Sequence, residues 1–216
     1  MLRKFLLGAV LIAGSTATVA GPIITFSEGF DDVSALAASG WLQVNKSAPI
    51  GGESWFQGLP EVFSADSGAD NSYIAANFNS AGFPGNVDNW LISPVFSVYD
   101  YTSVEFATRV GNQGLGDNLQ VLYSFGSTNL ADFLSIETIG NPLYPVDWTT
   151  FSYVANGSAD IRLAFRYLVT DNTINGDYIG IDSVVVKAVP EPGVIGMFAL
   201  ALLLLPLAMR RRREQA

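Results

Sequence analysis

Carboxylates are the side chains best placed for chemistry in this chain, because histidine and cysteine are both absent. Zinc sites built from His or Cys, Cys nucleophiles and a Ser-His-Asp triad are therefore excluded. Glu28 ends the first predicted strand and Asp182 lies on the last. If these strands lie close together, the two carboxylates could share one Ca²⁺, which takes about six to eight oxygen ligands. Asp31, Asp32 or Asp66 could complete the shell; the alternative is that Glu28 and Asp182 are separate surface carboxylates.

Residues 171–177 partly match the start of a calcium-binding loop, with Asp171, Asn175 and Gly176 in the expected order. Thr173 interrupts the pattern, and no Glu follows at the position that would bind calcium through both oxygens. A hairpin turn at Asn175-Gly176 explains the segment better, so no metal is assigned to it.

Aromatic side chains form the second group that could contact a ligand, by stacking on sugar rings. Trp55 and Phe56 are the candidates, because they follow the flexible pair Gly51-Gly52. Trp41 and Trp90 are assigned to the core, where aromatic residues of β-sandwiches usually pack. Acidic residues are plentiful, but no pair stands out as the two carboxylates of a glycoside hydrolase. No catalytic residue is therefore assigned.

The acidic residues also decide which partners the chain can have. Only Glu191 and Glu214 of the 20 acidic residues lie outside residues 21–190, so this segment carries 18 of them against five basic residues, a net charge of −13. Such a surface repels nucleic acid and anionic lipid, and it attracts divalent cations. We therefore expect no nucleic-acid partner.

The amino-terminal residues predict export. Arg3 and Lys4 precede the apolar run 5–13, and Thr18-Val19-Ala20 closes the stretch. A basic region, a short apolar region and a small-x-small site are typical of a secretory signal peptide, with cleavage expected after Ala20. The alternative, a transmembrane anchor, is weaker because the apolar run is too short to cross a bilayer. Residues 1–20 are therefore assigned as signal peptide.

The last residues, 189–216, predict a membrane-associated tail. The seventeen residues 193–209 carry no charge, and as a helix they would span roughly 26 Å, enough for a thin bilayer core. The four arginines that follow would hold that end in the cytoplasm by the positive-inside bias. Ahead of the helix, prolines disfavour helical structure and leave an extended segment that a protease can reach. The motif is Pro190, Glu191 and Pro192, and the basic stop is Arg210, Arg211, Arg212 and Arg213.

The order of these parts resembles the PEP-CTERM sorting tail of Gram-negative surface proteins. The resemblance implies processing near the Pro-Glu-Pro motif by an exosortase-type enzyme, after transient anchoring in the inner membrane. A permanent anchor is the alternative. Processing would leave a product of one domain on the cell surface or outside the cell.

Alternating apolar and polar residues predict an all-β domain over residues 21–188, because side chains on a strand point in turn to its two faces. The clearest runs are 104–110, 119–124 and 161–167, each predicted to have one buried face. Clusters of turn-forming residues separate these runs, as in an antiparallel β-sandwich. A helical turn is predicted only at 33–39, after candidate caps Asp31 and Asp32. Further strands are predicted at 23–27, 41–45, 72–78, 89–96, 148–155 and 178–187.

A series of short motifs along the domain resembles the choice-of-anchor J family, a relative of MAM and cleaved-adhesin modules. The motifs are Phe26-Ser27-Glu28-Gly29-Phe30, Gly40-Trp41, Ser54-Trp55-Phe56-Gln57-Gly58, Phe63-Ser64-Ala65, the segment 72–78, Asn89-Trp90-Leu91-Ile92-Ser93-Pro94 and the segment 177–182. The resemblance covers nearly all of the domain and implies a jelly-roll β-sandwich on a bacterial surface protein. Related modules often bind structural calcium, but Ser183 stands here where the family often has a second Asp.

Together these features predict an exported, non-enzymatic protein with a role in adhesion or in association with exopolysaccharide and biofilm matrix. A carbohydrate-binding module or a glycan-active enzyme is the alternative, and a purely structural coat component is a third. The expected partners are an exosortase-type enzyme, the membrane before processing and a surface glycan, with Ca²⁺ as the one candidate cofactor.

Overall fold

Two antiparallel β-sheets pack against each other in the computed structural model, which describes residues 23–99, 101–140, 142–155 and 157–188. The signal peptide at 1–20 and the sorting tail at 189–216, with its predicted helix at 193–209, lie outside the described residues. Within the described ranges, no helix has the length and apolar character needed to cross a membrane. All the described residues lie within the domain predicted at 21–188.

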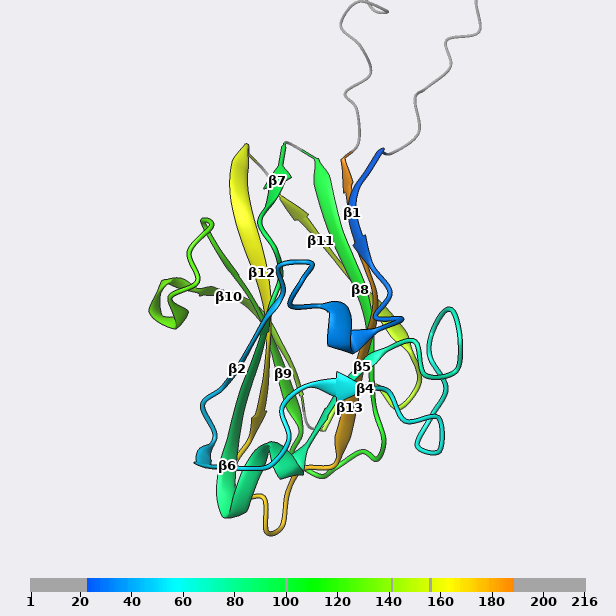
Figure 1. The fold of residues 1–216 in the computed structure, drawn as a ribbon, viewed down its shortest axis with the longest axis vertical. Helices are drawn as coiled ribbons and strands as arrows, with labels where there is room; N and C mark the ends of the chain where they lie inside the picture. Colours follow the sequence, from blue (N-terminus) through cyan, green and yellow to red (C-terminus); the bar gives the residue numbers. More distant parts are fainter. Residues whose placement is uncertain (1–22, 100, 141, 156, 189–216) are drawn as a thin grey trace, which may run out of the picture. The chain divides into compact units, whose positions relative to one another are not determined.

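The first sheet, here sheet 1, has six strands among the described residues (Figure 1). Their order is β11 (Thr149–Ala155), β8 (Thr102–Val110), β13 (Tyr178–Ala188), β5 (Ile74–Asn77) and β4 (Phe56–Gln57), with β1 (Ile23–Glu28) also paired to β13. Sheet 2 has seven in the same ranges. Their order is β10 (Leu134–Gly140), β9 (Asn118–Ser124), β12 (Ala159–Val169), β6 (Ala81–Ile92) and β2 (Leu42–Asn45), with β3 (Ala48–Ile50) on β6 and β7 (Phe96–Val98) on β12.

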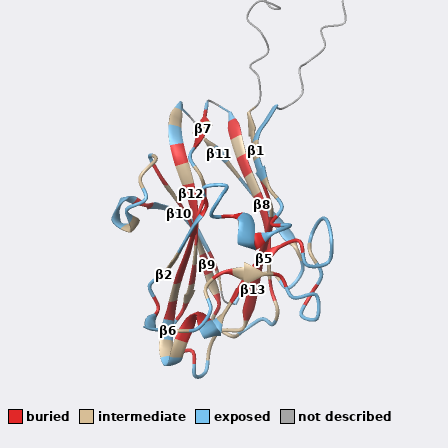
Figure 2. Cartoon of the chain, in the orientation of Figure 1, coloured by how far each residue is buried: buried red, intermediate tan, exposed pale blue. Residues whose placement is uncertain are grey.

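The core lies between the two sheets, and the alternating residues predicted to be buried form it. Figure 2 shows buried residues along the strands and exposed residues on most of the loops. One buried cluster contains Val104, Phe106 and Val110 of β8, Leu119 and Val121 of β9, and Ile161, Leu163, Phe165 and Tyr167 of β12. The prediction of an antiparallel β-sandwich and the inward faces of its three clearest strands are confirmed.

Both outer faces are partly buried as well, which the prediction of one buried face per strand did not include. On sheet 2, Phe133 follows the 3₁₀ turn η3 (Leu130–Asp132) and covers Trp90, Leu122 and Ala164. On sheet 1, Phe63 packs with Tyr73, Ala75 and Tyr178. Loops therefore cover apolar side chains that the strand pattern assigned to solvent.

Short and edge strands account for the other differences from the predicted elements. The predicted strands did not include β3, β4, β10 or a separate β7, and β6 begins at Ala81 rather than at residue 89. The strands β3, β4 and β7 are short and β10 is mostly exposed at an edge, so their apolar pattern is weak. The first half of β6 is largely exposed, and its apolar pattern is weak there too. The predicted helical turn is present as η1 (Val33–Ala35), where the side chain of Asp32, and not Asp31, caps it by accepting from Ser34 N. A second 3₁₀ turn, η2 (Phe78–Ser80), precedes β6.

Candidate functional site

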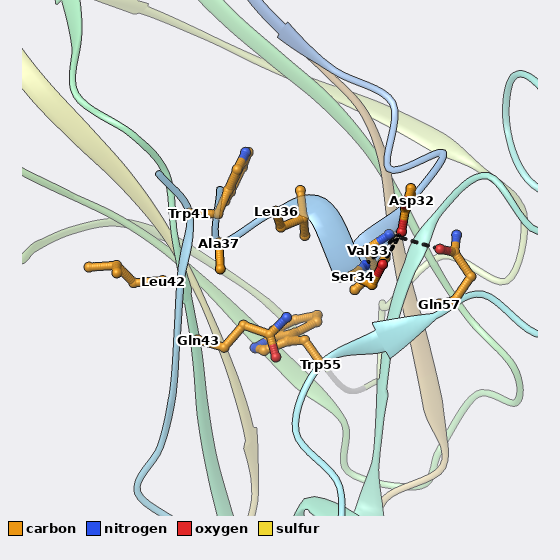
Figure 3. A pocket seen from close by; sticks show the side chains of 10 residues that line it. All are labelled: Asp32, Val33, Ser34, Leu36, Ala37, Trp41, Leu42, Gln43, Trp55 and Gln57. Carbon is orange, nitrogen blue, oxygen red and sulfur yellow. Dashed lines mark hydrogen bonds between the residues drawn. The ribbon is translucent and has the colours of Figure 1, made fainter. Parts of the chain in front are cut away.

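A groove of about 690 Å³ opens between the sheets at the edge formed by β2 and β4 (Figure 3). Apolar side chains line most of it, together with two amides, a hydroxyl and a carboxylate. The lining residues are Asp32, Val33, Ser34, Leu36, Ala37, Trp41, Leu42, Gln43, Trp55 and Gln57. We call this concavity the β2–β4 groove.

Gln57 fixes the shape of the groove by joining three segments. Its Nε2 donates to Phe30 O at 2.8 Å and to Asn71 O at 2.6 Å, while its Oε1 accepts from Val33 N at 2.9 Å. The strand β4, the turn η1 and the loop before β5 are thus held together by one side chain. These bonds fix the positions of the segments that line the groove.

Asp32 supplies the charge at the rim of the groove. Its Oδ1 accepts from Ser34 N at 3.0 Å and from Ser34 Oγ at 2.5 Å. The Ser34 hydroxyl, followed by the backbone N–H groups of Ser34 and Ala35, holds the pKa of Asp32 below its usual range although slight desolvation opposes it. The rim therefore presents an ionised carboxylate at neutral pH. Gln43, which is exposed on β2, adds an amide.

Trp55 and Phe56, the predicted stacking pair, lie on different sides of sheet 1 and do not form one platform. Trp55 is only 4% exposed and belongs to the inter-sheet core, whereas Phe56 packs on the outer face with its ring centre 5.8 Å from that of Tyr178. Consecutive residues in extended backbone point to opposite faces, which is the reason for the separation. Trp41 is buried as predicted.

The indole N–H groups of Trp41 and Trp55 are buried and have no acceptor among the described residues. A buried donor without an acceptor costs about 1–3 kcal/mol, so such groups usually meet water or a ligand. Both rings line the β2–β4 groove. The groove thus combines an aromatic lining with unused hydrogen-bonding capacity nearby.

The opposite edge of the sandwich, between β10 and β11, carries a second groove of about 390 Å³. Its lining is mostly apolar and includes Tyr123, Phe125, Ile136, Tyr153 and Val154. Tyr153 donates its hydroxyl to Glu137 Oε2 at 2.7 Å, which links the two edge strands. Burial and the nearby Glu137 carboxylate raise the pKa of Tyr153, so the phenol stays neutral.

Glu28 and Asp182 lie on adjacent strands, as the metal hypothesis requires. The ladder between β1 and β13 pairs Glu28 with Val184, so the first and last strands are neighbours. Glu28 Oε1 accepts from Phe30 N at 2.9 Å. Asp182 is fully buried at a bulge in β13, where Ser183 adopts a left-handed φ of 54°.

Asp182 anchors a loop in this structure. Its Oδ2 accepts from Asp66 N and Ser67 N, both at 3.0 Å, and its Oδ1 accepts from Ser183 N at 2.5 Å. Ser183 Oγ in turn donates to Asp66 Oδ2 at 3.0 Å. Burial raises the pKa of Asp182 to about 6, although the backbone donors oppose that shift. The loop that carries Phe63 is thereby attached to the outer face of sheet 1.

The carboxylates do not assemble into a metal centre among the described residues, where no group of three or more Asp and Glu could hold an ion. The nearby Asp66 and the cap Asp32 each use a carboxylate oxygen for a Ser hydroxyl. Asp171 likewise accepts from Thr173 N at 3.1 Å, as expected for a turn. The calcium hypothesis therefore stays a prediction.

Solved structures similar to this chain are cleaved adhesin domains. The K2 domain of Lys-gingipain matches with a TM-score of 0.56 and 20% identity, over 76% of this chain and 99% of that one. The K3 domain of Lys-gingipain from Porphyromonas gingivalis has a TM-score of 0.56 and 17% identity, over 76% and 98%. The K1 domain from the same organism has a TM-score of 0.56 and 20% identity, over 76% and 97%.

At these identities the likeness shows a shared fold, the antiparallel two-sheet sandwich of cleaved adhesin domains. No protein-family model and no curated protein matches the sequence. The cleaved-adhesin part of the predicted resemblance is thus supported at the level of the fold. The choice-of-anchor J and PEP-CTERM assignments stay predictions.

Proposed function

We propose that this chain is an exported cell-surface or matrix protein whose β-sandwich associates with a glycan, in adhesion or in exopolysaccharide and biofilm matrix. The observation that carries the proposal is the β2–β4 groove. It combines apolar and aromatic walls with Asp32, Ser34, Gln43 and Gln57, and sugars present both apolar faces and hydroxyl groups. The cleaved-adhesin fold is compatible with this role.

We propose that the domain binds the glycan and does not hydrolyse it. Asp32 is the one carboxylate among the described lining residues, and glycoside hydrolysis generally needs two acting together. Asp32 also spends one oxygen on capping η1. A domain of this kind would hold a glycan by its surface and leave the bonds of that glycan intact.

Affinity electrophoresis in gels that contain soluble polysaccharides tests the proposal. Ala37 is exposed and lines the groove, so Ala37→Trp should block it. Ala38→Trp places the same ring one residue away, at an exposed position outside the lining, and is the matched control. We expect retention of the wild type and of Ala38→Trp, and loss of retention for Ala37→Trp.

Three outcomes would contradict the proposal. Absence of retention by every polysaccharide would remove glycan association, and equal retention of both variants would exclude the β2–β4 groove. Release of reducing sugar by the wild type, lost on Asp32→Asn, would replace binding by catalysis.

The sorting of the protein is proposed from the tail at 189–216, which lies outside the described residues. We expect exported material to end near residues 190–193, because an exosortase-type enzyme would cut at Pro190, Glu191 and Pro192. Mass spectrometry of the mature protein measures this end directly. An intact Ala216 on protein at the outer surface would show that the tail is a permanent anchor.

Calcium is proposed as a structural ion that joins the first and last strands through Glu28 and Asp182. An ion bound only by the native state raises stability by about 2.7 kcal/mol at a hundredfold excess over its Kd. EDTA should then lower the melting temperature of a soluble 21–188 fragment by several degrees, and Asp182→Asn should remove most of the response. An unchanged melting curve would leave Asp182 as a loop anchor alone.

A further inference from the structure

Arg109 lies against an aromatic ring on the outer face of sheet 1 and has no ion-pair partner in the described part of the chain. In the ladder between β8 and β13 it pairs with Gly180, and its Cζ lies 4.2 Å from the centre of the Phe63 ring. Its Nε is buried without an acceptor among the described residues. No ion pair or hydrogen bond joins its two Nη groups to a described residue, and the side chain is partly exposed.

The Phe63 ring that contacts Arg109 belongs to a group of packed rings, which we call the aromatic cluster: Phe63, Tyr73, Trp148 and Tyr178. The Phe63 ring centre lies 5.0 Å from that of Tyr73, 5.5 Å from Trp148 and 5.2 Å from Tyr178. Trp148 Nε1 donates to Ser64 O at 2.8 Å, which fixes the loop over the sheet. Gly180 gives these rings the room to pack on the sheet, because a Cβ at this position would lie 2.8 Å from Trp148 and 2.9 Å from Phe63.

The other arginines on outer strand faces, Arg162 and Arg166, use their guanidinium groups in hydrogen bonds to described residues. Arg166 binds both oxygens of Asp88, from Nε at 2.7 Å and from Nη2 at 2.8 Å, and its Nη1 donates to Gln120 at 3.0 Å. Arg162 donates to the carbonyls of Gly126 and Ser93. Residues 21–190 contain 18 carboxylates, so an arginine among them without any acceptor is unusual.

We propose that Arg109 is an anion-binding subsite for the carboxylate of a uronic acid residue in a glycan, an inference that rests on the proposed glycan association. The guanidinium fork matches a carboxylate through two parallel hydrogen bonds. Trp148 is partly exposed and packs against Phe63, the ring that Arg109 contacts, so it offers a face for the sugar itself.

The charge of the domain narrows the ligand further. A net charge of −13 over residues 21–190 repels densely charged polyanions at long range, whereas one ion pair acts within a few ångströms. The ligand is therefore a glycan in which uronic acid residues are sparse among neutral sugars. Nucleic acids are too densely charged for this subsite.

The test compares two sugars on the wild-type protein by ligand-observed NMR. One is a trisaccharide with a single glucuronic acid, and the other is the same trisaccharide with the carboxyl reduced to a primary alcohol. We expect the reduction to weaken binding by about tenfold or more, because a charge-assisted bidentate contact is lost. This comparison needs no variant, so it does not depend on how any substitution folds.

Variants then assign the contact to Arg109. Arg109→Gln should abolish the preference for the acidic sugar, and Arg109→Lys should keep only part of it, because a lysine lacks the fork. Lys46→Gln removes one exposed positive charge elsewhere and is the control for net charge. It should bind both sugars like the wild type.

Equal affinity for the two sugars would overturn the subsite, as would a full preference in Arg109→Gln or an equal loss in Lys46→Gln. If neither trisaccharide binds while a neutral polysaccharide is retained in the affinity gel, the Arg109 proposal fails and the proposed function stands.

Discussion

The two outer faces of the sandwich each carry an arginine against an aromatic ring, yet the two are held differently. On sheet 2, Arg166 lies 4.8 Å from the centre of the Trp90 ring and binds Asp88 with two nitrogens. Trp90 Nε1 donates to the same Asp88 at 2.7 Å. On sheet 1, Arg109 has the ring of Phe63 but no carboxylate among the described residues.

The loops that cover the two outer faces also differ. Sheet 2 is covered by Phe133, whose ring lies 5.8 Å from that of Trp90. Sheet 1 is covered by a loop tied down at several points: Phe63 in the aromatic cluster, the Asp182 contacts to Asp66 and Ser67, and Leu59 N donating to the hydroxyls of Tyr73 and Tyr178. The comparison indicates that Arg166 serves the fold, whereas Arg109 is available to a ligand.

Removing the Phe63 ring from sheet 1 or the Phe133 ring from sheet 2 should have the largest effect on stability. Phe63→Ala should lower the free energy of unfolding by about 3–5 kcal/mol, because a buried ring is lost and a cavity remains. Phe133→Ala should cost less, since among the described residues Phe133 has one ring partner and Phe63 has three. Urea unfolding of the two variants measures both. A larger loss for Phe133→Ala would reverse the comparison.

Adding a methyl group at Gly180, beneath the loop that covers sheet 1, should have an intermediate effect on stability. Gly180→Ala would place a methyl group within 3 Å of Trp148 and Phe63, and overpacking typically costs about 1–3 kcal/mol. Gly29→Ala is a suitable control, because no atom of the described residues lies within 4 Å of a Cβ built there. A melting temperature unchanged by Gly180→Ala would mean that the cover moves away easily.

The arginines themselves should separate stability from binding. Arg166→Gln leaves Asp88 without its bidentate partner and should cost about 1 kcal/mol, a modest value because both side chains are about one quarter exposed. Arg109→Gln breaks no ion pair among the described residues and loses only the contact with Phe63, so it should cost about 0.5 kcal/mol. Thermal unfolding compares the two variants. A larger loss for Arg109→Gln would make it a structural residue.

Asp117, like Arg109, has a buried polar atom without a hydrogen-bond partner among the described residues, and we expect its effect on stability to be the smallest. Its Oδ1 accepts from Tyr167 Oη at 2.5 Å and from Asp177 N at 3.0 Å, while its Oδ2 is buried without a partner among the described residues. Burial raises the pKa of Asp117 above its usual range. The Asp117 carboxyl therefore binds a proton more tightly in the native state than in the unfolded state.

Stability from Asp117 should accordingly fall as the pH rises from about 4 through the raised pKa of the native state. Asp117→Asn keeps the two accepted bonds and cannot titrate. Urea unfolding at several pH values should show the wild type losing stability relative to Asp117→Asn over this window. A constant difference between the two proteins would show that Asp117 does not titrate differently in the native state.

Local alternation was sufficient to predict the strands that build the core. The runs around Phe106, Val121 and Phe165 showed which face would be buried, because a strand with one apolar face must bury it. The short β4 and the edge strand β10 were not predicted, since neither carries a strong apolar pattern. The first and last strands, which carry Glu28 and Asp182, are neighbours in the ladder between β1 and β13, the condition on which the calcium prediction depended.

The side-chain roles depended on partners far away in the chain. Trp55 and Phe56 are neighbours in sequence, but the turn of the backbone sends one to the core and the other to the outer face. Asp182 finds its donors at Asp66 and Ser67, more than a hundred residues earlier. Spacing within one segment cannot specify such meetings.

The sequence by itself determined the class of the fold, the inward faces of the main strands and the absence of histidine and cysteine chemistry. These properties follow from residue type and local period. Only the tertiary structure decided that loops cover the outer faces, that a groove opens between β2 and β4, and that Arg109 lacks the carboxylate that Arg166 has. These properties arise from contacts between distant segments, because the position of a loop over a sheet is set by the whole packing and not by its own residues.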